Sequence, residues 1–368
     1  MPEPQTLPEI LHTPPLSLFV AAWFFLLGAC WGSFLNVVIY RFPREMSVVR
    51  PRSHCFSCGK PLSWRDNIPV LGWLILRGKA RCCGAPFSPR YAIVEALTGA
   101  LFVVAWLQLP PAVALVAFVF ISLMVAGAFI DYDTQFLPDF VTIGGAAGGL
   151  VLAVLVPALH GHGDPQLPYV VAALRSALDA IVGMAVGSGI LLWLAMFAGK
   201  LLRKDAMGEG DVYLLGCIGA FCGWQGALFA IFGGALIGAA ATALLVLVNA
   251  LTGQRLTPGK TSKADPAPDN ANSAPDTVKS VPDNTVTASP ETTAPAVTTE
   301  AREGESGAEA DHPATASAEE PEVPSLGFGV QIPFGPWLAA GGLAYLLGAS
   351  EFVDAYLANA AAIFFNAW

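Results

Sequence analysis

Residues 112–130 of the chain read AVALVAFVFISLMVAGAFI, a run of 19 residues without a single charged side chain. About 20 apolar residues in a helix cross the hydrocarbon core of a bilayer. A helix that is apolar on every side has no face for water, so this run predicts a membrane-spanning helix rather than the surface helix of a soluble protein.

Similar runs recur along the 368 residues, of which 54% are hydrophobic and only 13% are charged. Soluble domains carry about 25% charged residues. We therefore expect an all-α polytopic membrane protein with about eight transmembrane helices and a small cytoplasmic cysteine-containing insert. The expected spans are residues 17–40, 91–109, 112–130, 139–158, 171–198, 212–224, 225–250 and 333–350.

Residues 41–90 hold ten of the 19 Lys and Arg residues, against only Glu45 and Asp66. A basic loop between two spans is expected on the cytoplasmic side of a membrane. Nucleic-acid binding is the rival interpretation of such a cluster, and the flanking spans disfavour it. We expect membrane lipid and no nucleic acid among the partners.

The net charge of −9 arises largely in residues 253–325, which contain 13 acidic residues and are otherwise rich in Pro, Ala, Thr and Ser. Such a composition cannot bury enough apolar surface to order itself, so it predicts a disordered linker. The expected divisions are a tail (1–16), a first span (17–40), the insert (41–90), spans two to seven with the catalytic motifs (91–252), the linker (253–325), and a last span with a C-terminal tail (326–368).

Two acidic motifs fall at the ends of expected spans, FIDYDTQFLPD at residues 129–139 and GEGD at residues 208–211. Alternation of the spans places both at the cytoplasmic edge. Carboxylates at span ends are often simply solvated, and we favour that reading for Asp133 and Asp139. Asp131 and Asp211, however, adjoin apolar runs directly, where an acidic side chain is costly.

Two carboxyl groups brought together in a poorly solvated cleft cannot both ionise easily. One keeps a proton while the other accepts one, which suits the activation of water for attack on a peptide carbonyl. Gly208 and Gly210 allow close backbone approach and positive φ beside Asp211. A proton or ion pathway is the alternative role for the same pair.

At these motifs the sequence resembles the bacterial type IV prepilin peptidases, which are membrane aspartyl proteases of the GxGD type. The resemblance extends to four further segments in the same order. These are GSFLNVVIYRFP at 32–43, NIP at 67–69, SPRYAIVE at 88–95 and IPFGP at 332–336. It covers the chain from about residue 28 to 350 except for the linker.

The resemblance implies that Asp131 and Asp211 are the catalytic pair of an endopeptidase in the bacterial inner membrane. The implied substrates are prepilin or pseudopilin proteins, which are cut at the junction of a leader and an apolar stem. It also implies a second activity, N-methylation of the new N-terminus with S-adenosylmethionine. Asn36, Arg41 and Glu95 are our candidates for that activity, although Asn36 equally fits a hydrogen bond between helices.

Cys55 and Cys58 form a CxxC pair, a spacing that can hold zinc if a second pair lies nearby. The family resemblance implies a second CxxC, but here Ala80 stands at its first position and the cysteines are Cys82 and Cys83. Both of these could ligate after a local rearrangement, or His54 or water could complete the site. A metal-free, reduced loop is the alternative.

Two other functions remain open at this point. A transporter or proton relay would use the acidic pair at the middle of the membrane. A non-enzymatic assembly factor of a secretion system would not need the pair at all.

Overall fold

The computed structural model describes residues 16–203, 208–252 and 333–365. Helices make up almost all of the regular structure in these ranges, and the only β features described there are the isolated bridges His54–Pro61 and Lys79–Pro86. The all-α prediction is confirmed. The predicted linker 253–325, and the predicted tail apart from Leu16, lie outside the described residues.

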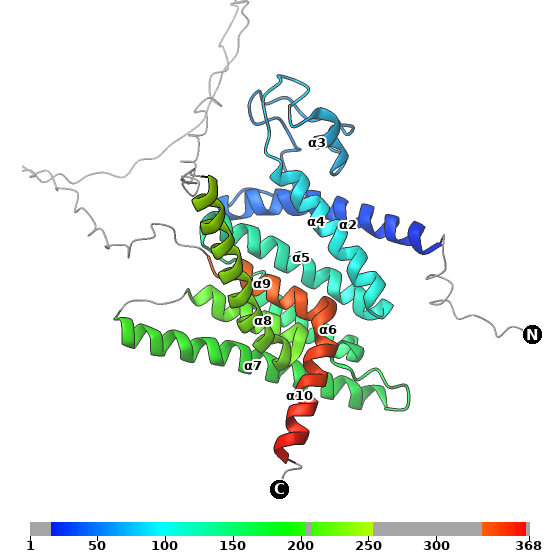
Figure 1. The fold of residues 1–368 in the computed structure, drawn as a ribbon. Coiled ribbons are helices and arrows are strands. Elements are labelled where there is room, and N and C mark those ends of the chain that lie inside the picture. The colour runs from blue at the N-terminus through cyan, green and yellow to red at the C-terminus, as the bar shows by residue number, and fades with distance from the viewer. Residues whose placement is uncertain (1–15, 204–207, 253–332, 366–368) are drawn as a thin grey trace, which may run out of the picture. The chain divides into compact units, whose positions relative to one another are not determined.

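The first half of the chain contains two long helices on either side of the insert, followed by a third. The elements are α2 (Leu16–Arg41), η1 (Phe42–Arg44), α3 (Leu71–Leu76), α4 (Arg90–Gln108) and α5 (Pro111–Thr134). The insert between α2 and α4 is mostly loop, and α3 is its one α-helix (Figure 1).

The second half contains two very long helices and a broken C-terminal one. The elements are α6 (Ile143–Leu155), η2 (Pro157–His160), α7 (Tyr169–Leu202), α8 (Glu209–Thr252), α9 (Gly335–Ala344), the π-helical turn η3 (Tyr345–Ala349) and α10 (Ser350–Phe365).

Proline and left-handed residues set several of these boundaries. α5 begins at Pro111, where the missing N–H of proline costs no helical hydrogen bond. It ends at Gln135, which adopts φ 53° and donates its N–H to the carbonyl of Asp131. α7 follows Pro168 and ends at Arg203, also left-handed with φ 53°. Asp131 and Asp133 therefore lie in the last turn of α5, whereas the remainder of the motif, up to Asp139, follows the helix.

Five of the described helices are long and apolar enough to cross a membrane: Ser17–Arg44, Arg90–Gln108, Pro111–Thr134, Tyr169–Leu201 and Glu209–Val248. The predicted span 139–158 is shorter than expected, because Pro157 begins a 3-10 turn and the helical part is only Ile143–Leu155. The predicted last span 333–350 is likewise divided between α9 and η3, and α10 continues beyond it.

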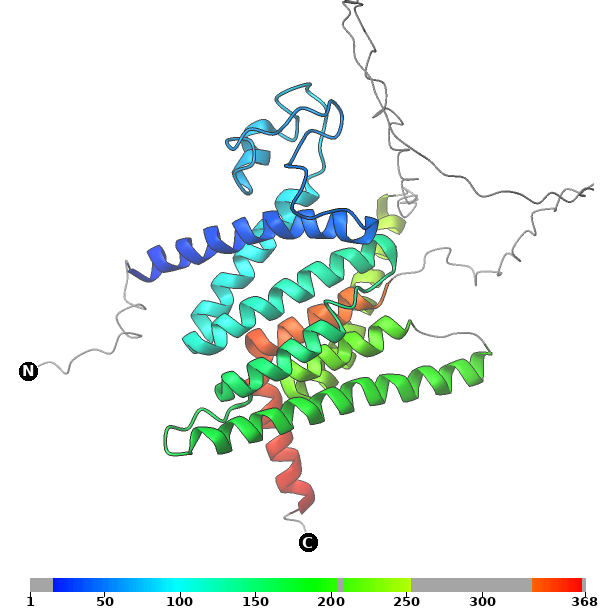
Figure 2. The ribbon, with the colours of Figure 1, turned by 180° about the vertical axis from the view of Figure 1, so that it is seen from behind.

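The predicted spans 212–224 and 225–250 form one element, α8, with a sharp kink between them. Gly223 has φ 68° and ψ −176°, a backbone conformation that residues with a Cβ rarely adopt. Figures 1 and 2 show that the chain turns back there, so that both ends of α8 lie on the same side of the bundle. The predicted change of direction near residue 224 is thus present without an intervening loop.

The centre of the bundle is α5. In its most apolar stretch of 18 residues, 67% of the residues are buried, against 33% or less in the corresponding stretches of the other four candidate spans. α9 packs against both α5 and α8 (Figure 2). Small residues permit this approach: a Cβ on Gly341 would lie 2.8 Å from the carbonyl oxygen of Ala230 in α8. The C-terminal segment is thereby brought to the ends of α5 and α8.

Candidate active site

Asp131 occupies the last turn of α5, and only 6% of its surface is exposed. The residue before it, Ile130, is fully buried in the core. The Oδ2 atom of Asp131 is buried and makes no hydrogen bond of full length and angle with the described residues, although the backbone of Gly335 lies close enough to interact with this carboxyl group. A buried polar atom without such a bond is costly, so this oxygen marks a place where a ligand or water is expected.

Asp211 occupies the first turn of α8, with 9% of its surface exposed. Its amide donates to the carbonyl of Gly208 at 3.3 Å. Gly210 is helical rather than at positive φ, and a Cβ there would lie 3.1 Å from the Cβ of Leu137. Of the properties expected of these two glycines, the structure has close approach at Gly210 only; Gly208 has no neighbour within 4 Å of its Cβ position, and neither glycine has a positive φ.

The two carboxyl groups meet at Gly335, the first residue of α9. A Cβ on this glycine would lie 2.5 Å from Oδ2 of Asp131 and 3.4 Å from Oδ1 of Asp211. Both oxygens thus lie beside a single point, although the two acids are 80 positions apart in the sequence. The structure brings Asp131 and Asp211 together in a site with little exposure to water.

Such a pair has the chemistry of a shared-proton dyad. Like charges this close are unfavourable, so one carboxyl group tends to hold the proton while the other remains a base. The base can take a proton from water, and the acid can donate to a carbonyl oxygen or a leaving amine.

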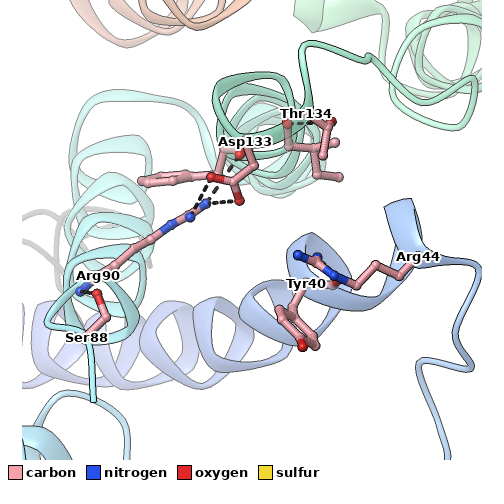
Figure 3. A network of polar contacts seen from close by, with 8 residues as sticks. Tyr40, Arg44, Ser88, Arg90, Asp133 and Thr134 are labelled. Carbon is pink, nitrogen blue, oxygen red and sulfur yellow. Dashed lines mark hydrogen bonds and ion pairs between the residues drawn. The ribbon is translucent and has the colours of Figure 1, made fainter. Parts of the chain in front are cut away.

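Asp133 is exposed, in agreement with the prediction of a solvated side chain, and it also forms an ion pair with Arg90 at the start of α4 that was not predicted. Nη1 of Arg90 lies 2.7 Å from Oδ1 of Asp133, and Nη2 lies 2.7 Å from Oδ2 (Figure 3). The same guanidinium donates to the carbonyl of Phe129 at 3.3 Å and lies 5.1 Å from the centroid of its ring. Arg90 therefore holds the last turn of α5, two residues from Asp131.

Arg44, on η1, lies apart from the Arg90–Asp133 pair and contacts Tyr40 of α2 (Figure 3). It donates to the Tyr40 carbonyl at 2.7 Å, and its guanidinium lies 4.2 Å from the Tyr40 ring centroid. Asp139 is exposed, in agreement with the prediction of a solvated side chain.

Comparison with known proteins identifies the family of the chain. The model of the Bacterial Peptidase A24 N-terminal domain matches residues 26–109, and that of the Type IV leader peptidase family matches residues 118–243. A prepilin leader peptidase/N-methyltransferase of Myxococcus xanthus is 39% identical over 249 residues, covering 67% of this chain and 70% of the relative. The chain belongs to the type IV leader peptidase family.

Other members of the family give the same result. A prepilin leader peptidase/N-methyltransferase of Klebsiella pneumoniae is 40% identical, covering 55% of this chain and 86% of the relative. A type 4 prepilin-like proteins leader peptide-processing enzyme of Escherichia coli is 36% identical, covering 53% of this chain and 74% of the relative. No solved structure matches the chain.

In this family member the four cysteines of the insert come together. The Sγ atoms of Cys55, Cys58, Cys82 and Cys83 all lie within 4.8 Å of one another. Individual separations are 3.7 Å for Cys55–Cys83 and 3.3 Å for Cys58–Cys82. Zn–S bonds of about 2.3 Å in a tetrahedron place sulfur atoms about 3.8 Å apart, so the donor set fits zinc without the predicted local rearrangement and without His54.

Two similar turns explain this geometry. In the first, the amide of Gly59 (φ 69°) donates to the carbonyl of Cys55 at 2.8 Å. In the second, the amide of Gly84 (φ 72°) donates to the carbonyl of Ala80 at 2.7 Å. Ala80 thus takes the structural place of Cys55, and Cys82 supplies the fourth sulfur from within the turn.

Hydrogen bonds from the backbone of Ser57 and Cys58 lower the pKa of Cys55 to about 6. The same cluster raises the pKa of Cys82 to about 12, chiefly through its hydrogen bond with Cys58, and also raises the pKa of Cys83, so in the absence of metal the cluster favours the thiolate form at Cys55.

The three residues predicted for methyl transfer lie where α2 and α4 meet the insert, and their polar groups have partners within the fold. Asn36 donates to the carbonyl of Tyr91 at 3.0 Å. Arg41 donates to the carbonyl of Ser47 at 2.9 Å and to that of Pro51 at 2.8 Å. Glu95 accepts from the amide of Val70 at 2.7 Å.

Sequence reasoning overlooked the roles of Gly335 and Arg90. The sequence identifies Gly335 as part of the IPFGP segment, and Arg90 as part of the SPRYAIVE segment and of the basic cluster, without a role for either. Asp133, two residues beyond Asp131, was a possible signal for a basic partner. Nothing in the sequence, however, indicated that this partner is Arg90, which is 43 positions away from Asp133.

Proposed function

We propose that this chain removes the leader peptides of type IV prepilin-like proteins, with Asp131 and Asp211 as its catalytic carboxyl pair. The observation that carries the proposal is the convergence of both carboxyl groups on Gly335. The names of the relatives support the same activity.

In the proposed reaction, one carboxylate takes a proton from water as the water attacks the scissile carbonyl. The other carboxyl group donates its proton to the carbonyl oxygen, and the tetrahedral intermediate collapses as the amine receives a proton. The Asp131 carboxyl group, which has no side-chain hydrogen-bond partner among the described residues, would take part in this proton exchange. Because α9 covers both acids, it limits the access of bulk water to the pair.

The proposed location is the bacterial inner membrane, with the insert on the cytoplasmic side. The five candidate spans and the basic insert support this arrangement. The substrate's apolar stem would lie in the membrane, and its leader would approach the acids at the ends of α5 and α8. Acids at helix ends suit this task better than the relay of a transporter, which needs acidic groups at the middle of the membrane.

The test is leader removal in cells that express a prepilin-like substrate together with Asp131→Asn or Asp211→Asn. We expect each substitution to lower processing by at least about 100-fold, because an amide cannot act as a general acid or base. Asp164→Asn, in the loop between η2 and α7, is the matched control and should process normally. Full processing by both site variants, at normal membrane levels, would refute the proposed pair.

The N-methyltransferase activity in the names of the relatives is a second part of the proposal. S-adenosylmethionine would supply the methyl group, and Asn36, Arg41 and Glu95 remain our candidates for this activity. Their present contacts hold α2, α4 and the insert together, so Glu95→Gln, which keeps the shape of the side chain, is the informative variant. Mass spectrometry of the processed N-terminus should show retained cleavage and reduced methylation.

The cysteine cluster would hold one zinc ion, and its role would be structural, because all four positions are filled by protein sulfur. We expect the purified chain to contain about one zinc per molecule, and Cys82→Ser to lose most of it. Cys30→Ser, in α2, is the control. The measurement is the number of zinc ions per protein molecule by elemental analysis. A Cys82→Ser protein with undiminished zinc would show that Cys82 is not a ligand.

A further inference from the structure

The short helix α3 presents an apolar face that nothing in the described structure covers. Leu71, Leu74 and Ile75 are 50%, 55% and 67% exposed. Their spacing of three and four positions places them on one side of the helix. We call these three residues the α3 face. No other described helix packs extensively against α3, and in Figures 1 and 2 it stands apart from the bundle.

Two other residues of α3, one beside the face and one behind it, are held by the insert, so the α3 face has a defined direction. A Cβ on Gly72 would lie 2.5 Å from the carbonyl oxygen of Asp66, which puts the preceding turn directly against the helix. The indole N–H of Trp73 donates to the carbonyl of Phe87 at 3.3 Å. The exposed leucines and isoleucine therefore cannot turn inward without dismantling these contacts.

Positive charge accompanies the α3 face. Arg77 is exposed and directly follows the helix at its C-terminal end. Arg65 lies in the turn packed on Gly72, and its guanidinium is 5.4 Å from the ring centroid of Trp64, which is itself 74% exposed. Residues 42–89 carry eight Lys and Arg against two acidic residues, and one of those, Asp66, is paired with Arg81 at 2.8 Å.

We propose that the α3 face, together with Trp64, Arg65 and Arg77, docks on an anionic lipid surface. Exposed apolar side chains beside arginine and tryptophan are the composition of segments that lie in the interface of a bilayer. Both ends of the insert join candidate membrane spans, α2 and α4, so the insert is expected to lie next to the bilayer surface. The occupant is the headgroup region of acidic phospholipids.

Two other occupants fit less well. A second copy of the insert would bring the same excess of positive charge against itself. The acidic residues 253–325 of this chain match the charge, but that segment is rich in Pro, Ala, Thr and Ser and offers few large apolar groups to cover leucine and isoleucine.

The test uses the full chain in nanodiscs of phosphatidylcholine alone or with phosphatidylglycerol. A photoreactive benzoylphenylalanine replaces Ile75, and in a control protein it replaces Lys60, which is exposed at the first cysteine turn. After irradiation, mass spectrometry identifies the partner. We expect lipid adducts at position 75 several-fold above those at position 60, with a higher yield in discs that contain phosphatidylglycerol.

Matched charge variants separate this site from general attraction of the basic insert. Arg65→Gln with Arg77→Gln should lower the lipid adducts at position 75 by about fivefold or more. Arg50→Gln with Arg52→Gln removes the same charge elsewhere on the insert and should have little effect. Equal effects of the two pairs would overturn the proposal, as would adducts to residues 253–325, adducts to a second copy, or a yield at position 75 no greater than at position 60.

Hydrogen exchange of the unaltered chain provides a test without any substitution. Backbone amides of residues 71–77 should exchange more slowly in phosphatidylglycerol discs than in phosphatidylcholine discs, while residues 55–60 should not change. Equal exchange of residues 71–77 in the two lipids would also overturn the proposal.

Discussion

Gly335 has no side chain, and this leaves room for the carboxyl groups of Asp131 and Asp211 at the start of α9. A methyl group there would lie 2.5 Å from Oδ2 of Asp131, closer than nonbonded atoms approach, and 3.4 Å from Oδ1 of Asp211. Either the carboxyl group or the start of α9 would have to move. The geometry of a catalytic pair tolerates little displacement, since an error of about 1 Å can cost about 100-fold in rate.

Gly335→Ala should therefore lower leader removal by about 100-fold while the protein still inserts in the membrane. The matched control is Gly148→Ala in α6, where a Cβ has no neighbour within 4 Å. Processing of a prepilin-like substrate, normalised to the amount of each variant in the membrane, is the measurement. Normal processing by Gly335→Ala would show that α9 does not lie against the acids during catalysis.

At the scale of elements, the site depends on the positions of three helix ends: the last turn of α5, the first turn of α8 and the start of α9. The last turn of α5 is fastened to the start of α4 by the two-pronged ion pair between Arg90 and Asp133, whose side chains are 35% and 30% exposed. Such paired geometry is stronger and more directional than a single contact. Its partial exposure makes its contribution to overall stability small, so its main effect is expected on the position of Asp131.

Arg90→Ala and Asp133→Ala should each reduce leader removal by about tenfold or more, with little change in the amount of folded protein. Exchange of the two charges, in Arg90→Asp with Asp133→Arg, should restore part of the activity. The double variant Arg90→Ala with Asp133→Ala completes a double-mutant cycle with the two single variants and the unaltered chain, and this cycle isolates the energy of the pair. If the exchanged protein is no better than the worse single variant, the ion pair is not what positions α5.

Element boundaries were predictable where the sequence carries a local signal. The start of α5 at Pro111 and the sharp turn near residue 224 follow from proline and glycine. The predicted span 139–158 was too long at both ends, because residues 139–142 form a turn and a 3-10 turn begins at Pro157, although hydrophobic residues occur in both places. Apolar composition reports burial or lipid contact, but it does not report where helical hydrogen bonds stop.

At the scale of the whole molecule, the sequence predicts much of the site but not its assembly. Charge bias placed Asp131 and Asp211 at the same edge, and the structure brings them together. The position of α9 was not predictable, since residues 253–325 separate it from α8 and no local pattern says which helices it joins. The sequence also could not decide whether Cys82 is a zinc ligand. The spacing of the cysteines does not show that Ala80 occupies the position of a ligand and that Cys82 supplies the fourth sulfur instead.

The most direct measurement is chemical cross-linking between positions 131 and 211. In the variant with Asp131→Cys and Asp211→Cys, reconstituted in lipid, a short uncharged thiol cross-linker should join the two positions within one chain, and peptide mass spectrometry should identify the link. Asp131→Cys with Asp164→Cys should remain unlinked. Absence of the 131–211 link, while each cysteine reacts singly with the same reagent, would contradict the convergence on which the proposed catalysis depends.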